Sequence, residues 1–181
     1  FFISEDWYFC SHRLPIAREI IKNGGKVTLI TRVDRCEEEI KQEGIRVIPL
    51  RRFKRRLQSP LSELLSLLEC IRIYRKESPQ MLHQVSLKPI IYGTIAARLA
   101  GVKNIVNAFA GMGSLFISEE SMHTIFQKLI LLFFRMIFKR KSIRLIFQNN
   151  HDLNMFIDNR VISKDQTAMI RGSGVNLKML K

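Results

Sequence analysis

The amino-acid sequence predicts an α/β fold with a doubly wound parallel sheet of about seven strands. Short apolar runs rich in β-branched residues alternate with helical patterns, which is typical of successive βαβ units. Glycine, proline and serine mark the ends of these segments, and no internal repeat interrupts the alternation. Because crossovers between parallel strands are right-handed, such a chain places helices on both faces of one sheet.

The first half of the chain is predicted to hold three strands, at 1–3, 26–31 and 45–50. The segment Ser4–Arg13 is predicted to be a loop that leads to a helix over 14–23, with Pro15 in its first turn. A short charged helix follows the second strand, over 36–43. After a basic loop, Ser59 and Pro60 begin a helix that carries leucines in helical register at positions 61, 64, 65 and 68.

The second half is predicted to hold four strands, at 81–85, 104–109, 144–148 and 166–171. Helices connect them over 88–100, 123–141 and 152–159. Asn150 or Asp152 is the expected cap of the last helix.

Ligands of an open parallel sheet bind at the carboxyl ends of its strands, so candidate site residues come from the loops there. The first loop lacks the GxGxxG pattern of a dinucleotide site and offers aromatic residues with His12 and Arg13. That surface suits a sugar or a lipid phosphate. Alternatively, the aromatic residues pack against the next helix, and the His-Arg pair caps it.

Two further loops carry polar residues. His83 lies near the end of a strand, and Lys88 stands at the following helix N-terminus, where amide dipoles and charge favour a phosphate. Asn107 precedes a glycine-containing loop with Gly111, Gly113 and Ser114, whose backbone and hydroxyl groups suit sugar hydroxyls. The alternatives are a structural histidine and an ordinary strand-to-loop turn.

The net charge of +14 predicts an anionic partner. Basic residues gather in two clusters, the second beside an apolar helical segment over 125–138, and this combination favours docking on an anionic membrane. Alternatively, the apolar face is core and the charges are solvated. The clusters are Arg51, Arg52, Lys54, Arg55 and Arg56, and Arg135, Lys139, Arg140, Lys141 and Arg144.

The longest apolar run is too short to span a bilayer, and no secretory signal is visible. Cys10, Cys36 and Cys70 show no metal-ligand spacing, so we expect reduced thiols and no metal site.

Four regions of the sequence resemble the N-terminal domain of glycosyltransferase family 4, of the GT-B fold. They are Phe2–Ala17, Leu82–Pro89 with Tyr92–Arg98, Val106–Gly113 and Gly172–Asn176. The chain most resembles bacterial enzymes that build lipid-linked oligosaccharides, O-antigen or capsule, such as N-acetylgalactosaminyltransferases acting on undecaprenyl-diphosphate-linked sugars. The fold class implied is the Rossmann-like N-terminal half of a GT-B protein.

The resemblance implies retaining transfer of a sugar, such as an N-acetylhexosamine, from a UDP-linked donor to a lipid-linked or glycan acceptor, without metal or cofactor. It implies that residues 1–175 form the acceptor-side domain, that 176–181 begin the interdomain linker, and that Gly172 and Gly174 form the hinge. The C-terminal domain, which binds most of the nucleotide and carries a Glu-x7-Glu motif, is absent, so we expect this chain alone to be inactive.

In this interpretation four residues would contact the acceptor or the donor phosphate, and Gly111–Ser114 would line the cleft. The four are His12, Arg13, Lys88 and Asn107, and His83 is a further candidate. No catalytic residue is identified. The protein would be cytoplasmic and peripheral on the inner face of the bacterial membrane, with no nucleic-acid partner.

Two alternatives remain from the sequence. The charge alone suggests a nucleic-acid-binding module, although no RRM, KH, OB or helix-turn-helix pattern is present. A nucleotide-sugar epimerase or dehydrogenase also uses a doubly wound sheet, but it would need the glycine fingerprint that the first loop lacks.

Overall fold

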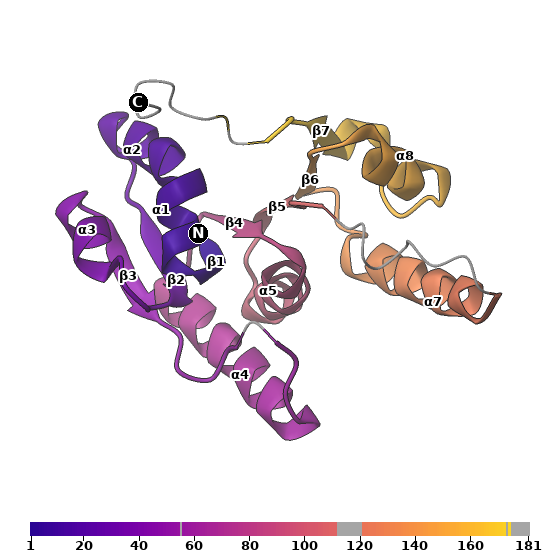
Figure 1. The fold of residues 1–181 in the computed structure, drawn as a ribbon, viewed down its shortest axis with the longest axis horizontal. Helices are drawn as coiled ribbons and strands as arrows, with labels where there is room; N and C mark the ends of the chain where they lie inside the picture. The colour runs from indigo at the N-terminus through magenta and orange to yellow at the C-terminus, as the bar shows by residue number, and fades with distance from the viewer. Residues whose placement is uncertain (55, 112–120, 173, 175–181) are drawn as a thin grey trace.

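The described part of the chain folds into one seven-stranded parallel sheet in the order β3-β2-β1-β4-β5-β6-β7 (Figure 1). The computed structural model describes residues 1–54, 56–111, 121–172 and 174, with the backbone alone for 121–126. The strands are β1 (Phe2–Glu5), β2 (Thr28–Arg32), β3 (Arg46–Pro49), β4 (Met81–Val85), β5 (Asn104–Ala108), β6 (Ile143–Phe147) and β7 (Thr167–Met169). This order is that of a doubly wound sheet, so the predicted fold class is confirmed.

Helices pack on both faces of the sheet. They are α1 (Asp6–His12), α2 (Leu14–Lys22), α3 (Glu37–Gln42), α4 (Pro60–Glu77), α5 (Leu87–Ala100), α7 (Ser121–Ile137) and α8 (Asn150–Asp158), with a 3-10 turn, η1 (Lys164–Gln166), before β7. One apolar core, which includes Ile3, Phe9 and Ile40, lies between the sheet and α1, α2 and α3. The other, which includes Phe2, Tyr74 and Phe156, lies between the sheet and α4, α5, α7 and α8.

The segment Ser4–Arg13 was predicted as a loop, and this prediction was wrong. β1 continues through Glu5, and α1 begins at the next residue without an intervening turn. The Asp6 carboxylate accepts the Trp7 N–H at 2.7 Å, and the Phe9 ring is fully buried in the core beneath α1. Burial of this aromatic side chain favours a helix that the local sequence does not signal.

The close packing of α5 on the sheet depends on Gly93. A Cβ atom at this position would lie 2.6 Å from Gln84 Nε2 and 2.8 Å from Phe2 Cδ1. The helix backbone therefore approaches β1 and β4 more closely than any larger residue permits. This contact holds the middle of α5 against β1 and β4.

The helix predicted after Ser59 is confirmed, and the Ser59 hydroxyl caps it by accepting the Ser62 N–H at 3.4 Å. Its leucines, however, mostly face outward. The side of α4 that meets the core carries Ser66, Cys70, Ile71 and Tyr74, whereas Leu61, Leu64 and Leu68 are exposed. The leucine pattern therefore identified the helix and not its buried face.

The two helices beside the β5–β6–β7 half of the sheet enclose an aromatic core. Phe109 stacks on Phe147 at 5.4 Å between ring centroids, and Phe156 of α8 meets both rings. The cap of α8 differs from the prediction, because Asn149 accepts the Asp152 N–H at 2.8 Å. No helix among the described residues is long and apolar enough to cross a bilayer.

Candidate functional site

The strand order places a topological switch point at the carboxyl ends of β1 and β4, the position at which doubly wound sheets form their ligand crevice. Crossovers from β1 lead outward through β2 and β3, whereas those from β4 lead the opposite way, so the chain changes winding direction between these neighbours. Ligands of doubly wound sheets bind at this topological switch point. The described segments at this edge are Glu5–Asp6 at the end of β1, Ser86 after β4, and Phe109–Gly111 after β5.

Ser86 joins β4 to α5 in a backbone conformation that L-residues rarely adopt, with φ of 74° and ψ of 155°. Its N–H donates to the Ala108 carbonyl at 3.2 Å, while its side chain makes no capping bond to α5. The first turn of α5 contains no acidic residue. Strained residues of this kind cluster at functional sites, and a helix N-terminus without a cap attracts anions. The sequence pattern did not reveal this strain.

The β1 side of the crevice is held by two carboxylates. Glu5 is nearly buried, and its Oε2 lies 3.6 Å from Arg32 Nε at the end of β2. Asp6 Oδ2 accepts the N–H groups of Asp34, Arg35 and Cys36 at 2.8–2.9 Å. Although burial opposes ionisation of Asp6, these backbone hydrogen bonds lower its pKa. Asp6 thus fixes the loop after β2 to the start of α1, and Glu5 links the ends of β1 and β2.

Three predicted site residues lie on the α1–α2 side of the sheet. His12 stacks on Tyr8, with ring centroids 4.2 Å apart, and its Nδ1 lies 2.6 Å from the Ser11 hydroxyl. Arg13 is buried, and one of its guanidinium nitrogens donates to the His12 carbonyl. Burial lowers the pKa of His83 to about 4, helped by the positive charges of Arg13 and of the chain's amino group. His83 is therefore neutral at pH 7.

Lys88 lies on the opposite side, against α4. Its ammonium is 2.9 Å from Glu63 Oε2, donates to the Arg56 carbonyl at 3.1 Å, and sits over the rings of Phe53 and Tyr92. Burial tends to raise the pKa of Glu63, but hydrogen bonds from Lys88 and Tyr92 hold it below its usual value. A phosphate contact by Lys88 would require this ion pair to open.

Asn107 is fully buried beneath α5. Its amide donates to the Thr94 hydroxyl at 3.1 Å, and Thr94 in turn donates to Gln84 Oε1 at 3.2 Å. The Gln84 amide then reaches the Tyr74 hydroxyl at 3.5 Å. This polar network satisfies groups inside the core. A ligand contact by Asn107 would require the network to rearrange.

The predicted site and hinge residues also include four glycines, of which the structure describes three. Gly111 follows β5 with φ of 115°, a conformation that favours glycine. Gly113 and Ser114 lie outside the described residues. Gly172 and Gly174 also have positive φ values, 88° and 73°, while their role as a hinge stays a prediction. The predicted site residues are thus divided between the two faces of the sheet, with Ser86 at the edge between them.

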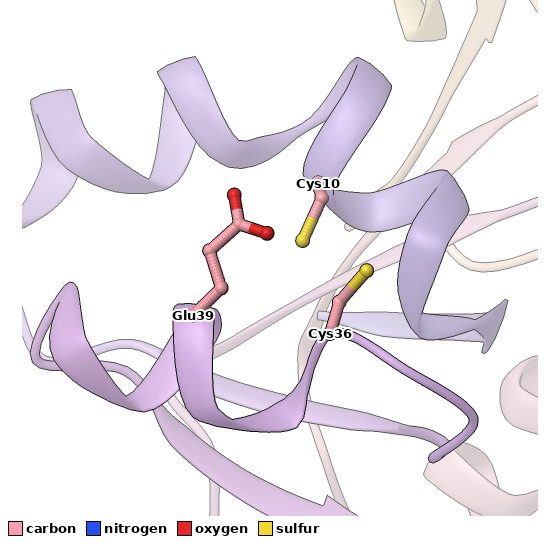
Figure 2. Close-up of side chains that lie close together, drawn as sticks. All are labelled: Cys10, Cys36 and Glu39. Atoms are coloured by element: carbon pink, nitrogen blue, oxygen red, sulfur yellow. The ribbon is translucent and has the colours of Figure 1, made fainter.

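One cluster that the sequence did not suggest has the side chains to hold a metal ion. Cys10 of α1, Cys36 at the start of α3 and Glu39 of α3 bring their ligand atoms within 4.8 Å of one another (Figure 2). Burial, and then the neighbouring Cys36 thiol, raise the pKa of Cys10 to about 12. The two cysteines follow the adjacent strands β1 and β2, and that adjacency was the available signal.

The sequence pattern of a family described as Glycosyl transferase 4-like matches residues 1–150. No curated protein matches the chain in sequence.

Two solved structures share the fold. A glycosyltransferase from Rickettsia africae ESF-5 aligns with a TM-score of 0.61 and 16% identity, covering 87% of this chain and 37% of that protein. MurG from Acinetobacter baumannii aligns with a TM-score of 0.59 and 12% identity, covering 99% of this chain and 46% of that protein. The chain therefore spans less than half the length of either structure, and the likeness concerns the fold.

Proposed function

This chain belongs to the glycosyl transferase 4-like family, and on that premise we propose that it is the acceptor-side domain of a retaining glycosyltransferase. The donor proposed is a UDP-linked N-acetylhexosamine, and the acceptor is a lipid-linked glycan carrying a diphosphate. The family match favours neither the nucleic-acid-binding module nor the epimerase or dehydrogenase. The C-terminal domain that would complete the enzyme is part of the same proposal.

The observation that carries the proposal is the geometry around Ser86. The residue strains the backbone at the switch point, and α5 begins there without a side-chain cap or an acidic residue. The helix dipole and the N–H groups of its first turn favour the diphosphate of an acceptor. Arg13 and His83 would act as supporting groups from the opposite face of the sheet, and Gly111 would allow the acceptor sugar to approach the backbone.

Trp7 gives a direct way to test acceptor binding. It is the one tryptophan of the chain, it lies in α1 just after β1, and the Arg35 guanidinium sits 5.9 Å from its ring centroid. We expect a short-chain polyprenyl-diphosphate-linked N-acetylhexosamine to change the Trp7 fluorescence saturably. UDP-N-acetylhexosamine should bind more weakly, because the family places most nucleotide contacts in the other domain.

Two serines of positive φ provide a matched pair of variants. Ser86→Asp places a carboxylate at the start of α5 and should weaken acceptor binding by about tenfold, through repulsion of the diphosphate. Ser78→Asp makes the same change at the end of α4 and should leave binding unaltered. If the acceptor does not bind, or if both variants weaken acceptor binding equally, the proposal that the acceptor binds at this crevice is wrong.

The outer surface of the α4–α5–α7 layer supports docking on an anionic membrane. α4 presents Leu61, Leu64 and Leu68, which recur at helical spacing and are exposed beside a basic loop that also exposes Leu57. The exposed basic residues of this loop are Arg51, Arg52, Lys54 and Arg56, while Arg55 lies outside the described residues. Such a surface binds an anionic membrane by burying its leucines at the membrane interface. Electrostatic attraction to the lipids adds about 1 kcal/mol of binding free energy for each basic residue.

α7 repeats the combination on the same side of the sheet. Leu129, Leu132 and Met136 are exposed along one stripe, and Arg135 and Lys139 are exposed beside it. A groove of about 660 Å³ runs between α7 and the segment after α8, with Arg160 on its far wall. A groove with apolar and cationic walls suits a phospholipid headgroup and the first part of its acyl chain.

Vesicle sedimentation tests the docking surface. We expect the chain to bind vesicles that contain phosphatidylglycerol and not to bind vesicles of phosphatidylcholine alone. Part of the binding to phosphatidylglycerol vesicles should remain at high salt. A Leu61→Ser/Leu64→Ser double variant should lose the salt-resistant part. Ile16→Ser/Ile20→Ser alters two exposed isoleucines on the opposite layer and should bind normally. Equal losses in the two double variants would exclude the α4 surface.

A further inference from the structure

We propose that Cys10, Cys36 and Glu39 form a binding site for a thiophilic divalent cation such as zinc, separate from the crevice at the switch point. The two thiols and the carboxylate come from α1, from the residue before α3, and from α3 itself. In Figure 2 the two sulfur atoms face each other, and the Glu39 carboxylate extends toward Cys10. Nothing in the glycosyltransferase activity proposed above requires these three side chains.

The distances fit zinc after small side-chain movements. All three ligand atoms lie within 4.8 Å of one another. Tetrahedral zinc, with bonds of about 2.3 Å to sulfur and about 2.0 Å to oxygen, separates its ligand atoms by about 3.5–3.8 Å. Rotation of the exposed Glu39 side chain and of the two half-buried thiols covers the difference. A water molecule would complete the fourth position.

The backbone around Cys36 is held in place before any metal binds. Asp6 Oδ2 accepts the N–H of Cys36 at 2.8 Å and those of the two preceding residues at 2.9 Å. Asp6 Oδ1 accepts the Trp7 N–H, which fixes the start of the helix that carries Cys10. One buried carboxylate therefore sets both thiols in position, as the outer groups of metal sites do. Because both its oxygens are occupied, Asp6 itself is not a ligand.

The charges of the three ligands and the protons that they release are compatible with binding of a soft divalent cation. Two thiolates and a carboxylate around a dication leave one negative charge, and the Arg18 guanidinium, which is paired with Glu43, also interacts electrostatically with Glu39 and Cys10. Binding releases the two thiol protons to solvent and changes no oxidation state. Sulfur ligands select zinc over magnesium or calcium, which prefer oxygen.

A bound cation would join α1 to α3, two helices that follow adjacent strands. The site lies one turn along α1 from Trp7, which follows the carboxyl end of β1. Binding would thus stabilise the loops at the carboxyl ends of β1 and β2 by acting on the folded state alone. The proposed role is to join the two helices, with the fourth coordination position left to water, and it does not place the metal on reacting atoms.

Cobalt and zinc titrations of the reduced, metal-free chain test the site. Co²⁺ should bind at one equivalent and produce the near-ultraviolet charge-transfer band of thiolate ligation. Zn²⁺ should displace it and raise the temperature of unfolding. Cys10→Ser and Cys36→Ser should each lower the zinc affinity by about 100-fold and remove the band, and Glu39→Gln should lower the affinity by about tenfold.

Two controls separate this site from incidental binding. Glu38→Gln changes the neighbouring carboxylate, which pairs with Lys41, and Cys70→Ala removes the buried thiol of α4; both should bind zinc as the unaltered chain does. The proposal is overturned if cobalt binds without a thiolate band, if Glu38→Gln weakens zinc as much as Glu39→Gln, or if the reduced chain binds no zinc. Because acceptor binding is read from Trp7 without metal, failure here leaves the proposed function unaffected.

Discussion

Lowering the pH from 7 to 5 should destabilise the protein through His83. Burial and nearby positive charge lower the pKa of this histidine from 6.5 to about 4, so the unfolded chain binds its proton more readily than the folded one. The stability that the neutral histidine contributes is therefore fully present when the pH is above its pKa in the unfolded chain. It is lost as the pH falls toward its pKa in the folded chain. Over two pH units the loss amounts to about 2 kcal/mol.

Urea unfolding at pH 7 and pH 5 measures this loss, with His83→Gln and His83→Leu as non-titrating comparisons. The chain's amino group, whose burial lowers its pKa to about 5, and the carboxylates also titrate, but they are present in all three proteins. The difference in pH dependence between the unaltered chain and each variant therefore reports His83 together with its coupling to the amino group. Equal pH dependence in all three would refute a buried, neutral His83.

Three further predictions concern groups that position the crevice. Asp6→Ala should lower the free energy of unfolding by about 3 kcal/mol in urea titrations, because three loop N–H groups lose a charged acceptor. Gly93→Ala should cost about 2–3 kcal/mol by the same assay, since its methyl group would overlap Gln84 and Phe2; an unchanged midpoint would contradict this packing. Lys88→Met should cost about 3 kcal/mol at pH 7 and less in acid, where Glu63 protonates more readily once Lys88 no longer lowers its pKa; an equal loss at both pH values would argue against the ion pair.

Much of the fold was predictable because hydrophobic periodicity and end signals are local properties. The strands around Leu29, Leu82 and Leu145 were located correctly, since each is a short apolar run between turn residues. The helix after Ser59 was also located correctly, because its cap and following proline lie next to each other in the chain. Parallel order followed from the alternation of strands and helices.

The direction in which side chains point was decided by tertiary packing. Asn107 precedes a turn and Lys88 follows one, at the strand ends where ligands of such sheets bind. Asn107 nevertheless faces Thr94, and Lys88 faces Glu63. Their partners lie 13 and 25 residues away, on other elements. A sequence pattern identifies a polar residue near a strand end, but its hydrogen-bond partner depends on which elements become neighbours.

The sequence by itself determined the family resemblance, the α/β class and the positions of most strands and helices, because these depend on local patterns of apolar and turn residues. Only the tertiary structure showed the strain at Ser86, the outward leucines of α4 and the meeting of Cys10 with Cys36. These features arise when strands adjacent in the sheet bring distant segments together. Their energies come from burial and from contacts between elements, which no single segment encodes.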